Sequence, residues 1–473
     1  MVIVSSSSDD LPGPRGLPIL GNVLQNPLDR EWLQYTAWGK QFGNIFKLNL
    51  FRQNVIIINS RKVAVDLLEK RSAIYSDRPR LIMAGELVGW NKGVTLRRPI
   101  ITELRRYRKD LHGMLGSKAT RQFWPVQEKA AKELILSLSK DPSDFFAHIR
   151  RAVTSTVVKI AYGHDIDSNQ DPFVTLAEKA QANFSLAATP NAFVVDWFPP
   201  VKFIPDWMPM AGFKRKAYLW RRQLEDLLEM TIETVKRAIE TGVVEPSYVS
   251  TLLMSRGLDG DAEDEIKWSA LSLYTGGADT TVVPLTTLVL VLVLHPEIKA
   301  RLQREMDLVT SGTRLPNFQD RDSLPFLRAC LLEVMRFRPA IPSGVAHRVV
   351  TEDVYKGFRI PKGAPICLHH DLYNPEKIQP DRFLAGDNED RTLAVFGFGR
   401  RICPGLHTAQ DSLFILAASM VAAFDFLPIC DTMGNPRLPM VNYTTGMISH
   451  PEQFKCQIIP RSKEIIPFIE ESE

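Results

Sequence analysis

The sequence predicts a mainly α-helical fold with small β-sheets, the α+β class. Two long apolar patterns, from about Asp264 to His295 and from Leu406 to Val421, have helical spacing. Strand-like alternation, in contrast, is confined to a few short stretches. The interior of the sequence contains no linker, repeat or low-complexity tract. We therefore expect a short N-terminal tail, residues 1–22, followed by one large domain over residues 23–473.

The composition is that of an ordinary globular protein. Of the 473 residues, 45% are hydrophobic and 24% are charged, which is enough to bury a large core. Fifty-eight basic and 54 acidic side chains give a net charge of +4, too small to indicate a nucleic-acid-binding protein. The five cysteines are never closer than 26 residues, which argues against a disulfide framework and against a zinc site with Cys-x-x-Cys spacing. We expect a protein of a reducing compartment.

The N-terminal tail lacks the features of a targeting segment. Residues 1–10 are rich in serine and only residues 1–4 are apolar, whereas a membrane-spanning helix needs about 20 apolar residues. A stretch rich in proline and glycine follows at residues 11–22. We expect a tail and hinge without a membrane anchor.

The first regular elements are predicted to be a β-hairpin and a helix. Apolar and polar residues alternate over residues 44–50, and residues 55–58 are continuously apolar, which is typical of two short strands. A helix with Val63, Leu67 and Leu68 on one side follows. Near the other end of the chain, residues 446–448 and 454–459 are predicted to form a second hairpin.

A glycine-rich stretch at residues 396–405 carries Cys403 onto the start of a predicted helix. Its glycines let the backbone bend and approach a flat ligand closely. Free backbone amides and the positive end of a helix dipole are expected to stabilise a thiolate at Cys403. The alternative is a small buried cysteine in a glycine-rich turn, which is the usual fate of a single cysteine.

A second motif lies inside the long pattern that begins near Asp264. Gly276 and Gly277 cost about 1 kcal/mol each in mid-helix relative to alanine, so something must justify them, and they allow a ligand to come close to the backbone. The hydroxyl of Thr280 can bond to a preceding carbonyl and bend the helix. The alternative is a glycine-rich helix that kinks before Pro284. The apolar run of residues 285–294 is short, as in a core helix and not a membrane span.

A third motif follows a predicted helix start at Asp322-Ser323-Leu324-Pro325, with a capping residue and an early proline. Glu333 and Arg336 stand three residues apart on one face of this helix. Taken alone, such a pair is usually a weak surface salt bridge.

The stretch Phe396 to Gly405, with Gly399-x-Arg401-x-Cys403-x-Gly405 inside it, resembles the haem-binding loop of the cytochrome P-450 family. The resemblance implies the P-450 fold, with haem (heme b) held between the long central helix and the Cys403 loop, and Cys403 as the axial ligand of the haem iron. The cofactor-binding residues that it implies are Cys403, Arg401, Arg108, Phe396, His347, Arg348 and Gly405. The substrate-facing residues that it implies are Leu273, Gly276, Gly277, Ile341, Val345, Met447 and Ile448.

The same resemblance gives roles to the other two motifs. Thr280 is expected to donate a hydrogen bond to dioxygen at the iron, and Asp279 to belong to the proton relay. Glu333, Arg336 and Arg382 are expected to form a buried structural lock. The sequence departs from the family at Leu104, where the family has tryptophan, over residues 95–102, and between His370 and Pro380, where it is shorter than expected.

The resemblance implies a haem-thiolate monooxygenase that hydroxylates a lipophilic small molecule such as a terpenoid, a steroid or a polycyclic aromatic. Electrons are expected from NADPH-cytochrome reductase, docking near Arg105, Arg106, Lys109 and Arg400 on a monomer. The context most similar is fungal secondary metabolism or xenobiotic oxidation. Alternatives are a haem-thiolate isomerase or dehydratase that needs no external electrons, an inactive haem-binding paralogue and, more distantly, a binding protein without haem.

Residues 193–210 form the most apolar loop of the chain, interrupted by four prolines. The segment is too broken by proline to be one helix. It is either a core-facing loop or an apolar surface patch of the kind that marks a membrane or partner site. The resemblance implies a peripheral contact with the endoplasmic reticulum membrane, on its cytosolic face, and the flanking Lys202, Lys214, Arg215 and Lys216 suit an anionic interface.

Overall fold

The computed structural model describes residues 9–27, 29–51, 53–98, 102–166, 171–189, 192–256, 260–368, 377–384 and 393–462. The helices within these residues are α1 Glu31–Phe42, α2 Arg61–Ala64, α3 Ser72–Tyr75, α4 Thr102–Leu115, α5 Trp124–Lys140, α6 Phe145–Tyr162, α7 Pro172–Ala188, α8 Val194–Trp197, α9 Gly212–Glu240, α10 Tyr248–Arg256, α11 Gly260–Ala278, α12 Val282–Leu294, α13 Pro296–Thr310, α14 Pro325–Phe337 and α16 Leu406–Ala423. The strands are β1 Ile45–Leu50, β2 Gln53–Ile58, β3 His347–Arg348, β4 Asp353–Tyr355, β5 Phe358–Ile360, β6 Pro365–Leu368, β7 Phe424–Cys430, β8 Pro436–Arg437 and β9 Cys456–Pro460.

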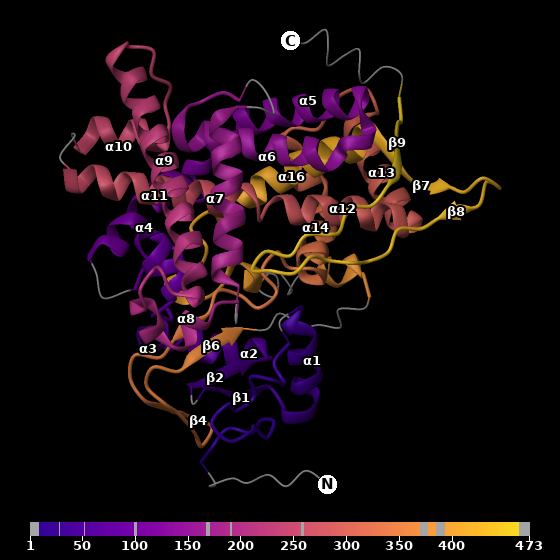
Figure 1. The fold of residues 1–473 in the computed structure, drawn as a ribbon. Coiled ribbons are helices and arrows are strands. Elements are labelled where there is room, and N and C mark those ends of the chain that lie inside the picture. Colours follow the sequence, from indigo (N-terminus) through magenta and orange to yellow (C-terminus); the bar gives the residue numbers. More distant parts are fainter. Residues whose placement is uncertain are drawn as a thin grey trace.

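Helices make up most of the molecule, and the small sheet of β1, β2 and β6 lies at the end that carries the N-terminus (Figure 1). The predicted mainly α-helical fold with small sheets is confirmed. A large apolar core is formed by buried side chains of α5, α6, α12, α14 and α16. Burial of this surface supplies the main driving force for bringing the helices together.

The predicted N-terminal hairpin is confirmed. Strands β1 and β2 pair antiparallel, with Ile45 opposite Ile58, and β6 adds to β2 in parallel. The proline-rich stretch before them packs on β1, since Lys47 N–H donates to the Pro12 carbonyl at 2.8 Å and Asn22 N–H donates to the Asn49 carbonyl at 2.6 Å. The hinge residues are thus tied to the sheet.

The predicted central helix is broken in two, contrary to the single long pattern in the sequence. Helix α11 ends at Ala278 and α12 begins at Val282. The break coincides with the Asp279-Thr280-Thr281 segment, where a side-chain hydroxyl competes for a backbone carbonyl. The run Gly260–Leu294 is long and apolar enough to cross a membrane, yet 78% of its most apolar window is buried inside the protein. The prediction of a core helix over residues 285–294 is confirmed, since α12 is buried up to Val293.

The predicted cap of α14 is wrong. The helix does begin with Pro325 in its first turn, but Leu324 precedes it and makes no side-chain cap. The free N–H groups of Phe326 and Leu327 instead donate to the Glu305 carboxylate of α13, at 2.7 and 2.9 Å. A residue from another helix therefore satisfies donors that a local cap usually satisfies.

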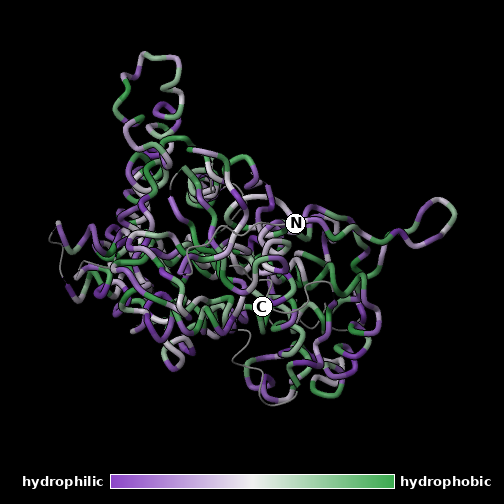
Figure 2. Tube along the Cα trace, turned by 90° about the horizontal axis from the view of Figure 1, so that it is seen from below, coloured by the Kyte–Doolittle hydropathy of each residue, from purple (hydrophilic) through white to green (hydrophobic). Residues whose placement is uncertain are grey.

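The predicted C-terminal hairpin is also wrong in its pairing. Strand β9 pairs antiparallel with β7, with Phe426 opposite Ile458, while residues 446–448 form no strand. Gly446 has a φ of 114°, which turns the chain there and prevents a regular strand. Strands β7 and β8 form an arm that projects from the body of the molecule (Figure 1; Figure 2).

Candidate active site

A cavity of about 310 Å³ lies between the break in the central helix and the residue 396–405 loop. Its walls come from α4, α6, α7, α11, α14, α16 and the segments around residues 340 and 447. The predicted site residues that line it are Arg108, Leu273, Gly276, Gly277, Thr280, Ile341, Val345, His347, Phe396, Arg401, Cys403, Gly405, Met447 and Ile448. The fold thus brings together residues that are more than 300 positions apart in the sequence.

The Cys403 loop is held by its own backbone. Cys403 N–H donates to the Phe396 carbonyl at 2.7 Å, which closes the loop. Gly399 has a φ of 53°, and a Cβ there would lie 2.4 Å from the Leu68 carbonyl oxygen, so no side chain fits at this position. The loop then enters α16 through Gly405. The turn therefore fixes the cysteine backbone before any ligand is considered.

The environment of the Cys403 thiol differs from the sequence-based expectation. Burial raises its pKa, although the Gly405 N–H and the Arg108 charge both act to lower it. The predicted helix-end and charge effects are present, but in the protein alone they do not outweigh desolvation. A thiol that coordinates a metal ion is deprotonated by that ion, so the raised pKa is compatible with a ligand role.

Several cations gather at one side of the cavity. Arg401 donates from Nε to the Ser76 carbonyl at 2.9 Å, and further N–H groups reach the carbonyls of Val94 and Arg97. Burial lowers the pKa of Arg401 to about 10, with Arg108 adding to the effect. Arg108 itself donates to the Ile402 carbonyl at 2.8 Å, and burial lowers its pKa.

Arg78, which the sequence analysis missed, belongs to the same group. It is buried, lines the cavity and donates to the carbonyls of Thr95, Val345 and Ala346 at 2.7 to 3.0 Å. Burial lowers its pKa, and the charges of Arg401 and Arg108 add to this. A buried excess of positive charge is expensive unless an anion compensates it. This end of the cavity is therefore suited to acidic groups of a ligand.

Of the two residues predicted to contact the cofactor here, His347 lines the cavity and Arg348 does not. His347 lines the cavity, its Nδ1 lies 2.7 Å from the Tyr75 carbonyl, and burial together with the Arg78 charge lowers its pKa to about 3. The imidazole is therefore neutral. Arg348 is not among the lining residues of the described chain; its Nε lies 3.5 Å from the Asp77 carboxylate.

The helix break opens the opposite wall. Thr280 Oγ1 donates to the Gly276 carbonyl at 2.6 Å. No heavy atom would lie within 4 Å of a Cβ at Gly276, whereas a Cβ at Gly277 would approach Val157 at 3.1 Å. Gly276 therefore leaves backbone exposed to the cavity, and Gly277 permits close packing of α11 on α6.

The Asp279 side chain contacts Arg150 and His450, whereas its neighbour Thr280 lines the cavity. Its carboxylate lies 2.8 Å from Arg150 Nη1 of α6 and 3.1 Å from His450 Nε2, and it is not among the residues that line the cavity in the described chain. Burial acts to raise its pKa, but the hydrogen bond from His450 and the charges of His450 and Arg150 hold the pKa at about 2. The carboxylate is thus ionised and fixed at the break.

Three charged residues lie behind the cysteine loop. The Glu333 carboxylate, which is completely buried, lies 2.6 Å from Arg336 Nε and 3.1 Å from Arg382 Nε. The Gln379 N–H donates to the same carboxylate at 2.6 Å. This arrangement joins α14 to the segment at residues 377–384.

The structure describes some of the positions at which the sequence departs from the family pattern. Leu104 is buried in α4 within an apolar cluster and does not line the cavity. Residues 99–101 and most of the stretch between His370 and Pro380 lie outside the described residues.

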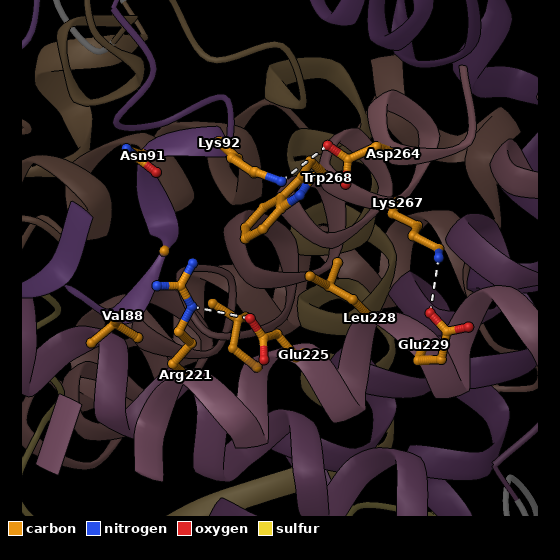
Figure 3. Close-up of a pocket in the computed structure, with 12 residues that line it drawn as sticks. Val88, Asn91, Lys92, Arg221, Glu225, Leu228, Glu229, Asp264, Lys267 and Trp268 are labelled. Atoms are coloured by element: carbon orange, nitrogen blue, oxygen red, sulfur yellow. Dashed lines mark hydrogen bonds and ion pairs between the residues drawn. The ribbon is translucent and has the colours of Figure 1, made fainter. Parts of the chain in front are cut away.

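A second cleft of about 200 Å³ lies between residues 88–92, α9 and α11 (Figure 3). Its charged side chains pair with one another: Lys92 with Asp264, Arg221 with Glu225 and Lys267 with Glu229. Trp268 lies beneath Lys92, one turn of α11 before Ser272 of the main cavity. The charges of this cleft are satisfied without a ligand, so the main cavity remains the candidate site.

Comparison with known proteins decides the family. A family model described as Cytochrome P450 matches residues 11–457. The chain belongs to this family. It is 38% identical over 464 residues to cytochrome P450 monooxygenase 208 of Postia placenta, covering 95% of this chain and 90% of that protein. It is 35% identical over 479 residues to the tryptamine 4-monooxygenase of Psilocybe cyanescens, covering 96% and 94%.

A solved structure shows the same P450 fold. It is a zebrafish cytochrome P450 with abiraterone, which has a TM-score of 0.73 and 21% sequence identity and covers 91% of this chain and 100% of that one. The predicted family, fold, haem cofactor and enzyme class are confirmed. The protein is a P450 of the haem-thiolate monooxygenase family, with relatives in fungi, and such enzymes use electrons that derive from NAD(P)H.

The cavity of this P450 fits haem. A thiol stands at the end of a glycine-rich loop, and the buried Arg78 and Arg401 and the half-buried Arg108 have no acidic side chain among the described residues that line the cavity. Two carboxylate groups at the edge of a flat ligand match this charge. Cys403 is the cysteine among the cavity-lining residues described. The donor set and the charge therefore agree with the family's cofactor.

Proposed function

We propose that this P450 hydroxylates a lipophilic small molecule of the terpenoid, steroid or polycyclic aromatic class. The supporting observation is a largely apolar cavity that encloses both the Cys403 thiol and the Thr280 hydroxyl. Its substrate-facing residues are expected to be Leu273, Gly276, Gly277, Ile341, Val345, Met447 and Ile448. Apolar walls with a few placed polar groups are typical of sites for such ligands. One fungal relative is named for oxidising tryptamine, which is consistent with a small organic substrate.

The residues of the chain would divide the work. Cys403 would hold the iron, while Arg78, Arg108, Arg401 and neutral His347 would hold the two acidic groups of haem. When bound, haem supplies the oxygen chemistry. The apolar walls would orient the substrate and exclude water.

Proton handling is assigned to the helix break. Thr280 Oγ1 faces the cavity and would hold a proton there. Asp279 would position this turn through Arg150, whose side chain is half exposed and links the break to solvent. With a pKa of about 2, Asp279 would act as a fixed anion that orients donors, and Thr280 would carry the proton at the cavity.

Electrons would come from NADPH-cytochrome P450 reductase, bound to a monomer on the cysteine side of the cavity. Arg105, Lys109 and Arg400 are exposed there. Arg106 is also exposed but forms an ion pair with Glu265, so we expect it to contribute less. Exposed positive charge speeds association with an acidic partner.

The residue 193–210 loop supports a peripheral contact with the endoplasmic reticulum membrane. It folds into short helical turns separated by prolines, and its large side chains point outwards: Phe203 is 77% exposed and Trp207 81% exposed. Val195, in contrast, is buried beneath them. These exposed apolar side chains favour the membrane-facing interpretation over the core-facing one.

The test is the absorbance spectrum of the purified, dithionite-reduced protein under carbon monoxide, followed by turnover with the reductase. A thiolate-type Soret band and reductase-dependent hydroxylation of a member of the three substrate classes are expected. Haem uptake without that band would contradict the role of Cys403. The band without oxidation of any compound in the panel would contradict the substrate class.

A further inference from the structure

One polar side chain in the cavity has no role in the haem site. Gln181 of α7 lines the cavity, and its Oε1 is fully buried without a hydrogen-bond partner. No other cavity-lining residue in the described ranges has a buried side-chain atom in this state. Buried polar atoms are nearly always paired, so each exception needs a cause.

The cavity-lining hydroxyls of α11 and of the turn that follows it behave differently from Gln181. Ser272, Thr275 and Thr280 each donate to a carbonyl one turn earlier in the helix, at 2.7, 2.9 and 2.6 Å. They are satisfied without a ligand. The Gln181 amide has no such local carbonyl bond, so it is available for an external partner.

The surroundings of Gln181 make its unpaired state costly. The cavity that Gln181 lines has apolar walls, among them Ile160, Phe184, Leu273 and Met447. The Phe184 ring packs on Trp90 with the ring centroids 4.6 Å apart, so this wall is well filled. An amide among apolar side chains loses its hydration and regains it only through a hydrogen bond.

Asn183, two residues further along α7, shows that this helix can satisfy an amide. Its Nδ2 donates to Gln223 Oε1 of α9 at 2.7 Å, and it does not line the cavity. The unpaired amide is therefore confined to the helix face that meets the cavity. This contrast points to the cavity's ligand as the missing partner.

We infer that Gln181 anchors a hydroxyl group of the substrate. This inference rests on the proposed function, because it concerns the molecule that the P450 oxidises. An amide offers one acceptor and two N–H donors, and a hydroxyl can donate to the acceptor or accept from a donor. A hydroxyl therefore satisfies the amide whichever way it is turned.

The anchor places the reaction after a step that leaves a hydroxyl group on the substrate. Such a step is an oxygenation, a hydration, a hydrolysis or the reduction of a carbonyl. Gln181 would fix this group and leave a carbon elsewhere on the molecule to face Cys403. A site that hydrogen-bonds a substrate hydroxyl discriminates against analogues that lack it.

The test compares three forms of one scaffold on haem-loaded protein. The probes are androstan-3-ol, 3-methoxyandrostane and androstane, with 2-naphthol, 2-methoxynaphthalene and naphthalene as a smaller set. Dissociation constants are measured from the shift of the haem absorbance band. The variants are Gln181→Leu, which removes the amide at similar size, and Asn183→Leu as the matched control on the same helix.

Wild type and Asn183→Leu are expected to bind the hydroxylated member of at least one set about five- to tenfold more tightly than its methoxy analogue. Gln181→Leu is expected to lose this preference and to keep a Tm at or above that of wild type, because it removes an unpaired buried group. Equal affinities in wild type, absence of binding by both hydroxylated probes, or a preference that survives in Gln181→Leu would overturn the inference.

The same samples separate this inference from the proposed function. The carbon monoxide spectrum and reductase-dependent oxidation are recorded on each protein. An intact thiolate band and turnover, together with no hydroxyl preference, would reject the role of Gln181 alone. Loss of the band in wild type would reject the haem site itself.

Discussion

The floor of the cavity and an outer layer of the molecule, here called the roof, are built differently. The floor, defined as residues 393–405 with Glu333, Arg336 and Arg382 behind them, is held by buried ion pairs and by backbone bonds such as Cys403 N–H to the Phe396 carbonyl. The roof, defined as the turn Ile82–Val88 with residues 193–210, contributes no described residue to the cavity lining. Its turn is buried, whereas residues 193–210 expose large apolar side chains. The floor is therefore specified by the protein alone, whereas the roof presents a surface that needs a partner.

Polar contacts join the two segments of the roof. The Asp196 carboxylate accepts from the N–H groups of Ile82 and Met83, the latter at 2.9 Å, and Lys202 lies 2.9 Å from Glu86. Ile82, Met83 and Val195 also belong to an apolar core cluster. The comparison teaches that buried ion pairs and backbone bonds fix the loop that carries Cys403, whereas the roof combines a buried apolar side with an exposed apolar one.

The largest effect is expected from Cys403→Ser in the floor. A serine hydroxyl does not replace a thiolate as a soft ligand, so the thiolate-type band under carbon monoxide and the monooxygenase activity should both disappear. Cys367→Ser is the control, because Cys367 lies in β6 and does not line the cavity. A thiolate band that persists in Cys403→Ser would show that another residue binds the iron.

Glu333→Gln should be the next most severe change. It leaves Arg336 and Arg382 buried or half-buried without their anion, and the free energy of unfolding should fall by about 3–5 kcal/mol. Urea unfolding of the purified protein measures this. The exposed pair Arg359 and Glu352 offers the control, since Glu352→Gln should leave the unfolding midpoint unchanged. Similar unfolding midpoints for both variants would show that the buried ion pairs of Glu333 stabilise the protein no more than the exposed pair of Glu352.

Thr280→Val should lower the rate of product formation without changing the environment of Cys403. Removing the hydroxyl that faces the cavity should lower product formation about 100-fold, because positioned proton transfer is worth at least this much. The carbon monoxide spectrum should stay unchanged. Product formed per NADPH consumed is the measurement, with Thr275→Val on the preceding turn of α11 as the control. An unchanged yield would assign proton delivery to another group.

Asp196→Asn should change the stability of the protein in a way that depends on pH. Burial raises the pKa of Asp196 to about 6, although the N–H groups of Met83 and Ile82 act to lower it. The folded protein therefore holds this proton more tightly than the unfolded chain, and wild-type stability should fall as pH rises from about 4 through 6. The asparagine does not titrate, so the variant should not lose stability in this pH range for this reason.

The measurement for Asp196→Asn is the difference in unfolding midpoint between variant and wild type from pH 5 to 7.5. The difference should shift in favour of the variant as pH rises through about 6 and then level off. A difference that does not vary with pH would mean that the carboxyl is already ionised throughout this range.

The smallest effect on stability is expected from Trp207→Ser in the roof. Trp207 is exposed, so its loss should change the free energy of unfolding by less than about 0.5 kcal/mol. Sedimentation with vesicles of zwitterionic and anionic lipids should nevertheless show weaker binding, because apolar area is lost from the membrane-facing surface. Equal vesicle binding by wild type and Trp207→Ser would show that Trp207 does not take part in the membrane contact.

How much the sequence could predict depends on whether the signal is local. The Cys403 loop and the glycine pair before Asp279 were recognisable, because each function is carried by residues close together in the chain. The hairpin of β1 and β2 was predictable for the same reason. The cap of α14 was not, since Glu305 belongs to another helix.

The missed site residues share this non-local character. Arg78 has no pattern around it that predicts burial among cavity-lining residues, and its bonds reach Val345 and Ala346 far along the chain. Arg150 and His450 meet Asp279 only through the packing of α6 and the C-terminal segment. Gln181 stands on an amphipathic helix where an amide is unremarkable until the cavity is seen. Long-range contacts of this kind leave no periodicity in the sequence.

The break between α11 and α12 also limits the length of the most apolar helix in the folded protein. With 13 residues and a rise of about 1.5 Å per residue, α12 is about 20 Å long, whereas the hydrocarbon layer of a bilayer is about 30 Å thick. The charged Asp279 lies directly before it, and a carboxylate in hydrocarbon is strongly disfavoured. In the folded protein, the turn that opens the cavity to a ligand therefore also divides the apolar run Gly260–Leu294 into two helices, of which the more apolar one is shorter than a bilayer is thick.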